Sequence, residues 1–236
     1  MRLQAFLARA GAAPSRRKAE TPILDGRVTV NGERATLGAT VTPGDEIELD
    51  GRPVLLPETR VYLALNKPPG YLTTMNDERG RRTVADLMPD VPGLVPAGRL
   101  DASTTGLLIL TNDGELIHRI THPSSEIEKQ YRLTLENPVP DAALAALATG
   151  PNLEDGRMHA PKLANLSRTR DTTTLDLTIH EGRNRIIRRA CAAVRLVLLS
   201  LKRVRVGPVE LGNLPEGRYR ELTEKELNIL ENTGRT

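Results

Sequence analysis

One residue of this sequence that could do covalent chemistry is Asp101. It precedes a run of small and hydroxyl-bearing residues, 102–106, directly before the apolar run GLLIL. A loop that leads into a buried strand is a common place for a reactive group, and a carboxylate there could add to an electrophilic carbon or remove a proton. An aspartate beside serine and threonine is also typical of a plain turn that its own side chain closes. The local pattern leaves both interpretations open.

The segment 181–205 is a second candidate for function, because it is strongly basic. It holds eight arginines and lysines and one acid, Glu181, so it carries a charge of +7 in a chain whose net charge is +3. Such a local excess suits the binding of a polyanion through contacts that weaken steeply as salt is added. A solvated helix face is the competing interpretation, and the charge count alone does not separate the two.

The composition argues against several classes of protein. The single cysteine, Cys191, has no internal partner for a disulfide, and the four histidines are scattered without the spacing of a metal site. One phenylalanine, four tyrosines and no tryptophan are too few to stack successive bases, so any RNA contact should be mainly electrostatic. No apolar run of membrane-spanning length and no secretory signal is visible, so we expect a cytoplasmic protein without a membrane partner.

These candidate residues need elements to position them, and the first is a compact N-terminal unit over residues 1–50. Apolar residues recur at helical spacing up to Gly11, which can end that helix, and Ser15 can cap a second, basic helix. Pro22 should stop or kink this second helix, because an interior proline costs about 3 kcal/mol. Alternating residues around Asn31-Gly32 predict a hairpin, and DEIELDG predicts a further strand.

A linker is expected over residues 51–60, which contain two prolines and a glycine. The main domain should then span residues 61–236. This gives a small N-terminal unit followed by one larger domain, which suits the chain length of 236 residues.

The main domain is expected to have an α+β fold. In the helix that follows EGRNR, Ile187, Ala190, Cys191 and Val194 predict a stripe that faces the core, with arginines on the adjoining surface. Strands outnumber helices and often follow one another, which favours a mostly antiparallel, mixed sheet flanked by helices. Strands are expected in VYLALN, YLTT, GLLIL, KQYRLTLE, TTLDLTIH and LVLLSLKRVRVGPVELG, and helices in RRTVADLMPD, ELIHRITH and DAALAALATG.

Motifs in both parts of the chain resemble those of known families. SRR at 15–17 and GRVTVNG at 26–32 resemble an S4 RNA-binding domain. GRLDASTTGLLILTNDGEL, which starts at residue 98, resembles the signature of the RsuA/RluB-type RNA pseudouridine synthases, which act on ribosomal RNA. Three further blocks are similar to motifs of that family: LNKPPGYLTT at 65–74, EKQYRLTL at 128–135 and EGRNRIIRRA at 181–190. Ile186 and Ala190 depart from the family's usual Gln and Met.

The resemblance implies an isomerase that converts a uridine of ribosomal RNA to pseudouridine without a cofactor or a metal. Asp101 would act on a flipped-out uridine, by covalent addition or by a glycal route, while Arg188 pairs with it and Tyr131 lies against the uracil. Arg99 would occupy the space that the flipped base leaves. The residues expected to bind RNA by this likeness are Lys67, Arg183 and Arg185 in the main domain and Arg16 and Arg17 in the S4-like domain.

The expected partner is ribosomal RNA, free or in a subunit-assembly intermediate, and the family likeness implies a monomer. The run LKRVRVGPVELGNLPEGRYRELTEKEL looks more like the large-subunit-directed members, which implies 23S rRNA.

Two other functions stay open at this point. A non-catalytic, ribosome-associated RNA-binding protein would need only the S4-like domain and the arginine-rich helix. A nucleosidase or glycosidase would need a pair of carboxylates, and no second acid stands in a setting comparable to that of Asp101.

Overall fold

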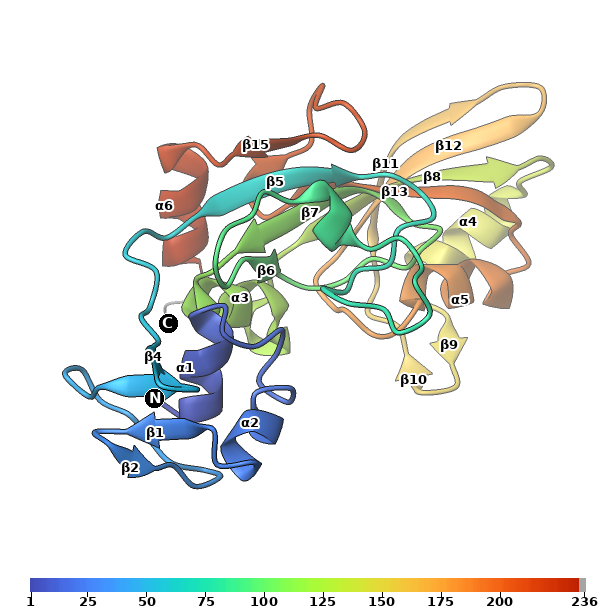
Figure 1. The fold of residues 1–236 in the computed structure, drawn as a ribbon. Coiled ribbons are helices and arrows are strands. Elements are labelled where there is room, and N and C mark those ends of the chain that lie inside the picture. The colour runs from blue at the N-terminus through green and yellow to red at the C-terminus, as the bar shows by residue number, and fades with distance from the viewer. Residues whose placement is uncertain (234–236) are drawn as a thin grey trace.

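The computed structural model describes residues 1–233 and shows a small N-terminal unit beside a large sheet (Figure 1). The last three residues of the expected main domain, 234–236, lie outside the described residues. Within residues 1–233, no helix is long and apolar enough to cross a membrane.

The N-terminal unit packs two short helices on a four-stranded antiparallel sheet of order β2-β1-β3-β4. Asn31 and Gly32 both have positive φ, 53° and 80°, as the predicted tight hairpin requires. Its own apolar core includes Leu3, Leu7 and Ile23. The elements are α1 (Leu3–Arg9), α2 (Glu20–Leu24), β1 (Val28–Val30), β2 (Glu33–Arg34), β3 (Ile47–Leu49) and β4 (Arg52–Pro53).

The second helix differs from its prediction. The Ser15 hydroxyl accepts a hydrogen bond from the Lys18 amide, but the helix itself begins at Glu20 and includes Pro22. The expectation that Pro22 stops the helix is therefore wrong. Pro22 lies in the first helical turn, where the backbone nitrogen has no intrahelical acceptor and a proline costs little.

The two units touch through a close backbone approach. A Cβ on Gly93 would lie 2.1 Å from the carbonyl oxygen of Arg9, at the end of α1. Only glycine allows this contact, and φ of +72° at Gly93 would strain any other residue. In addition, part of the stretch expected as a linker, residues 51–60, belongs to the N-terminal unit. It contains β4, which pairs with β3.

The main domain is built on a nine-stranded sheet, in which the principal order is β11-β12-β8-β13-β7-β5-β15. Within residues 1–233, the one parallel pair of strands in this sheet is β13 with β7. The predicted α+β class and the mostly antiparallel, mixed sheet are thus confirmed. The strands of this sheet are β5 (Tyr62–Lys67), β6 (Val95–Pro96), β7 (Thr105–Thr111), β8 (Lys129–Glu136), β11 (Lys162–Arg168), β12 (Thr172–Ile179), β13 (Leu198–Val206), β14 (Val209–Glu210) and β15 (Tyr219–Glu221). A separate two-stranded hairpin is formed by β9 (Asn152–Leu153) and β10 (Gly156–Arg157).

Helices and loops cover the sheet in separate clusters. Helices α4 and α5 pack on β8, β12 and β13, and α3 and α6 pack on β5 and β7. The other face of β5 and β7 is covered by the loops and turn between these two strands, so β5 and β7 are buried on both sides. The helices are α3 (Gly114–Thr121), α4 (Asp141–Ala148), α5 (Ile186–Ala193) and α6 (Glu224–Asn232), with 3-10 turns η1 (Val84–Leu87) and η2 (Pro123–Ser125).

One predicted strand of the main domain is absent. The segment YLTT makes only an isolated bridge, from Leu72 to Thr83. The reason is that Pro68 and Pro69 follow directly on β5, and a proline has no amide hydrogen to continue a ladder. The chain therefore leaves the sheet at Lys67, and the loop that follows packs against the segment carrying Asp101.

Candidate active site

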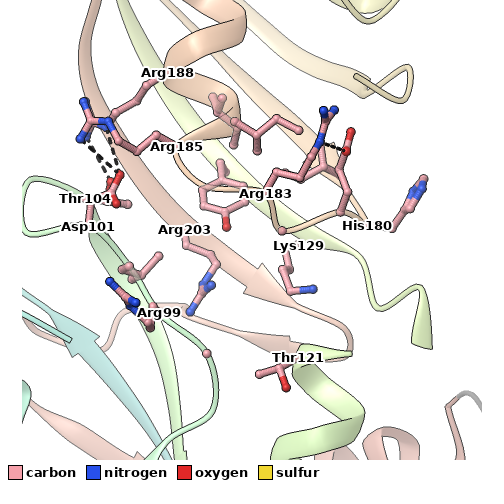
Figure 2. A pocket seen from close by; sticks show the side chains of 18 of the residues that line it. Arg99, Asp101, Thr104, Thr121, Lys129, His180, Arg183, Arg185, Arg188 and Arg203 are labelled. Carbon is pink, nitrogen blue, oxygen red and sulfur yellow. Dashed lines mark hydrogen bonds and ion pairs between the residues drawn. The ribbon is translucent and has the colours of Figure 1, made fainter. Parts of the chain in front are cut away.

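A cleft of about 760 Å³ opens where the loop before β7 meets β8, β13 and the start of α5. Its lining includes seven basic and three acidic side chains, so the concentration of positive charge that the sequence shows is also present in space. Figure 2 shows side chains from these elements converging on the cleft. The charged lining residues are Arg99, Asp101, Lys129, Asp155, Arg157, Glu181, Arg183, Arg185, Arg188 and Arg203.

Asp101 stands at the mouth of a tight turn, with its side chain 32% exposed. The turn is closed by the backbone, because the Thr104 amide donates to the Asp101 carbonyl oxygen at 3.0 Å. Within residues 1–233, no hydrogen bond to the Asp101 carboxylate is formed. The side chain therefore does not close the turn, as the interpretation of Asp101 as a plain turn residue would require.

Two arginines from the α5 motif face this carboxylate (Figure 2). Arg188 Nε and Arg185 Nη1 each lie 3.7 Å from Asp101 Oδ2, too far for a hydrogen bond but close enough for strong attraction. Arg188 Nη2 also donates to the Thr104 hydroxyl at 3.1 Å, which fixes the guanidinium against the same turn. Arg188 Nε is buried without a hydrogen-bond partner. The predicted pairing of Arg188 with Asp101 is present as a loose ion pair.

Arg185 lies near Asp101 and has an unusual backbone conformation. It caps the start of α5 with a φ of 48°, in the left-handed region. That conformation turns the chain sharply as it enters the helix and directs a half-exposed guanidinium toward Asp101. Arg185 was expected to contact phosphate, and the structure places it at the carboxylate.

Lys67 does not fit its expected role as a phosphate contact. Its side chain is completely buried, and its ammonium group donates to the carbonyl oxygens of Pro68, Ala102 and Thr104 at 3.0, 3.3 and 2.9 Å. Burial lowers the pKa of Lys67 to about 8, an effect that the charge of Asp101 opposes. An RNA phosphate cannot reach this group. Instead, Lys67 ties the end of β5 to the loop that carries Asp101.

Arg183 likewise makes its contacts within the protein. Its guanidinium contacts Glu181 at 2.9 Å and Asp155 at 2.8 Å, and it donates to three backbone carbonyl oxygens of residues 155–157. Arg189 binds Asp155 as well, and these hydrogen bonds lower the pKa of the Asp155 carboxyl below its usual range. Arg183 therefore fastens the β9–β10 hairpin to the start of α5, which is a poor fit to the expected phosphate contact.

The remaining predicted residues lie at different places. Tyr131 is half-buried on β8 and lines the cleft, opposite Arg203 on β13. Arg99 is exposed and lines both this cleft and a neighbouring groove between the two units. Arg16 and Arg17 are exposed on the N-terminal unit, outside the cleft.

Several cleft residues were not among the site residues predicted from the sequence, and Thr104, Lys129 and Arg203 matter most for the chemistry of the cleft. The alternation of side chains along a strand could have identified Lys129 and Arg203. Lys129 shares a strand face with Tyr131, and Arg203 shares one with the buried Leu201, so each is a charge at an inward position. Thr104 carried no comparable signal, because its role depends on how α5 docks.

The arrangement offers one carboxylate that is free to react and two acids that are not. Asp155 and Glu181, the other acids of the lining, are both held by arginines. The paired carboxylates of a glycosidase, one protonated as an acid, are therefore not provided by this cleft. A single ionised carboxylate beside guanidinium groups can instead act as a nucleophile or a base.

Comparison with known proteins shows relatives that are similar to this chain in sequence and in structure. Residues 61–193 match the RNA pseudouridylate synthase family, and residues 1–47 match the S4 domain. An uncharacterized RNA pseudouridine synthase of Aquifex aeolicus is 44% identical over 96% of this chain and 92% of its own length. The ribosomal large subunit pseudouridine synthase B of Bacillus subtilis is 43% identical over 97% of this chain and 95% of its own length.

A solved structure is similar over nearly the whole chain. A crystal structure of a pseudouridylate synthase superposes with a TM-score of 0.70 and 34% identity, over 98% of this chain and 99% of the other. Together with the family match over the domain that holds the cleft, this establishes the relationship. The chain belongs to the RNA pseudouridylate synthase family and carries an N-terminal S4 domain.

Proposed function

We propose that this enzyme isomerises a uridine of large-subunit ribosomal RNA to pseudouridine, with Asp101 as the catalytic carboxylate. One observation carries the assignment of Asp101: its carboxylate faces two guanidinium groups in a basic cleft and is not hydrogen-bonded to any other group within residues 1–233. The ribosomal substrate is supported by the Bacillus subtilis relative, whose name gives the large ribosomal subunit.

The reaction is balanced without any co-reactant. The bond from C1′ to N1 breaks, the uracil turns, a bond from C1′ to C5 forms, and the proton on C5 is lost while N1 gains one. Asp101 either adds to C1′ or removes a sugar proton to open a glycal route. In either route the carboxylate must be held in place, which is the role we give to Arg188 and to the Thr104 hydroxyl that Arg188 contacts.

Other residues position the substrate in this proposal. The target uridine leaves the RNA stack to reach the cleft, where Tyr131 lies against the uracil. Arg99, at the junction of the cleft and the groove between the two units, takes the space that the base leaves. Arg16 and Arg17 contact the RNA backbone from the S4 domain, where both are exposed.

The test is the variant Asp101→Asn, which keeps the size of the side chain and removes its charge. The substrate is ribosomal RNA taken from cells that lack the enzyme. We expect the variant to form no new pseudouridine in this RNA, while its affinity for the RNA stays within a few fold of that of the unmodified protein. Asp90→Asn is the matched control, because Asp90 is exposed and outside the cleft. Pseudouridine formation by Asp101→Asn at the control rate would overturn the assignment.

The same experiment separates the two other functions. If the chain only bound RNA, the Asp101→Asn variant would restore the phenotype of cells that lack the chain. Neither the variant nor the unmodified protein would then form pseudouridine. A glycosidase would release free uracil, which chromatography of the reaction detects.

A further inference from the structure

Two basic side chains of the cleft are unlike the others. Arg203 on β13 is only 4% exposed, and Lys129 on β8 is partly buried beside it. This burial and, to a smaller extent, the charge of Arg203 lower the pKa of Lys129 to about 8. Both lie on one face of the sheet, because Arg203 is paired with Tyr131 and Lys129 is two residues before Tyr131 on the same strand. Figure 2 shows both side chains at the cleft, below Arg188 in this view.

The position of Arg203 is set by the backbone around it. Arg203 Nε donates to the carbonyl oxygen of Leu107 at 2.7 Å. The strands can approach this closely because residue 106 is glycine: a Cβ there would lie 2.2 Å from the Arg203 carbonyl oxygen. One nitrogen of the guanidinium is therefore satisfied by the protein, and within residues 1–233 the other two make no hydrogen bond.

Neither of these cations has an acidic partner in the part of the chain that the structure describes. Lys129 donates only to the carbonyl oxygen of Ile127, at 3.1 Å. Two other partly buried cations of the lining are compensated: Arg188 faces Asp101, and Arg183 contacts Asp155 and Glu181. Two adjacent charges of like sign without an anion, one buried and one partly buried, are costly, because desolvation and mutual repulsion act in the same direction.

We propose that Lys129 and Arg203 form an anion-binding subsite in the cleft, and that it takes a phosphate group of the RNA backbone at the target nucleotide. A carbonyl oxygen of uracil would accept hydrogen bonds but would neutralise neither charge, whereas a phosphate supplies both a formal charge and several acceptor oxygens. The subsite rests on the proposed function in that the ligand is RNA. It would hold the nucleotide by its phosphate while the base turns.

The test compares two small ligands that differ only in the phosphate: uridine and uridine 5′-monophosphate. Each is titrated at millimolar concentration against the full chain, and binding is followed by chemical shifts in NMR spectra. We expect the unmodified protein to prefer the monophosphate, and Lys129→Gln to reduce that preference about tenfold, as for loss of one charged hydrogen bond. Lys225→Gln is the matched control, because Lys225 is exposed on α6 and outside the cleft.

A second variant guards against misfolding of the first. Arg203→Lys keeps the charge but loses the planar fork, so we expect it to retain part of the preference for the monophosphate. Equal binding of both ligands by the unmodified protein, or no binding of the monophosphate, would overturn the proposal. So would an equal loss for both ligands in Lys129→Gln, since that would place Lys129 at the base or sugar. None of these measurements involves turnover, so the proposal can fail while the result for Asp101→Asn stands.

Discussion

Asp101 and Asp155 both face arginines of the segment 183–189, yet the two carboxylates are held very differently. Asp155 contacts Arg189 at 2.7 and 3.0 Å and Arg183 at 2.8 Å, in hydrogen-bonded ion pairs. Asp101 is approached by Arg185 and Arg188 only to 3.7 Å. Burial does not explain the contrast, because the side chain of Asp155 is the more exposed of the two, 45% against 32%.

The difference separates a structural carboxylate from a reactive one. Both carboxylate oxygens of Asp155 accept hydrogen bonds that fasten the β9–β10 hairpin to the arginines before and within α5, so Asp155 is already engaged within the protein. Around Asp101, by contrast, the two arginines stay at 3.7 Å, and the carboxylate accepts no hydrogen bond within residues 1–233. An active site needs such unused capacity, since its groups must strengthen their contacts in the transition state rather than before it.

The largest effect in this comparison is expected from Arg188→Met, which removes the guanidinium and keeps most of the side-chain volume. Turnover should fall about a hundredfold, because the carboxylate loses the group that holds it. Arg188→Lys should restore part of the rate, since it returns the charge without the contact to the Thr104 hydroxyl. Single-turnover kinetics on ribosomal RNA measures both, and an unchanged rate in Arg188→Met would remove the distinction between the two aspartates.

A smaller effect is expected from Lys67→Met. The three carbonyl oxygens that Lys67 holds include those of Ala102 and Thr104, so the loop that carries Asp101 should loosen. We expect kcat to fall about tenfold with KM unchanged, because Lys67 acts on the position of Asp101 and does not reach the RNA. A rise in KM alone would return Lys67 to the role of a phosphate contact.

Lys67 should also leave a signature in the dependence of stability on pH. Burial lowers its pKa in the folded protein to about 8, against an ordinary value of 10.5. Between these values the unfolded chain binds more protons, so the contribution of Lys67 makes the folded state more stable as pH rises, by no more than about 3 kcal/mol. Lys129 contributes with the same sign. Urea denaturation at pH 7.5 and 10 should show part of this rise missing in Lys67→Met.

The smallest effect on turnover is expected from Asp155→Asn, the counterpart of Asp101→Asn. The rate should stay within about threefold, while the midpoint of thermal unfolding falls, since two arginines lose their charged partner. The pKa of Asp155 is lowered in the folded state, so its contribution to stability is present above the unfolded value and is lost as pH falls through the folded one. Thermal unfolding from pH 7 down to 3 should therefore be less pH-dependent in the variant. A loss of turnover as deep as that of Asp101→Asn would show that both aspartates are catalytic.

Local periodicity was enough to predict many elements of the fold. KQYRLTLE is β8, DAALAALA is α4, and the stripe of Ile187, Ala190 and Cys191 is buried in α5. These predictions succeeded because the burial of one face imposes a period that is visible without knowledge of the partner. The segment YLTT has the composition of a strand but no neighbour to pair with, and β15 and α6 were not predicted at all.

What the sequence by itself determined is the family, the α+β class and the group of residues around Asp101, since motif spacing and face periodicity are properties of the chain alone. The tertiary structure decided which cation serves which carboxylate. The docking of α5 and the segment before it assigns Arg188 to Asp101 and Arg183 to Asp155. Among residues 1–233, the pairing of β13 with β7 and β8 leaves Arg203 and Lys129 without an acid. Partners in an ion pair are set by strand order and helix docking, and these depend on contacts between residues far apart in the chain.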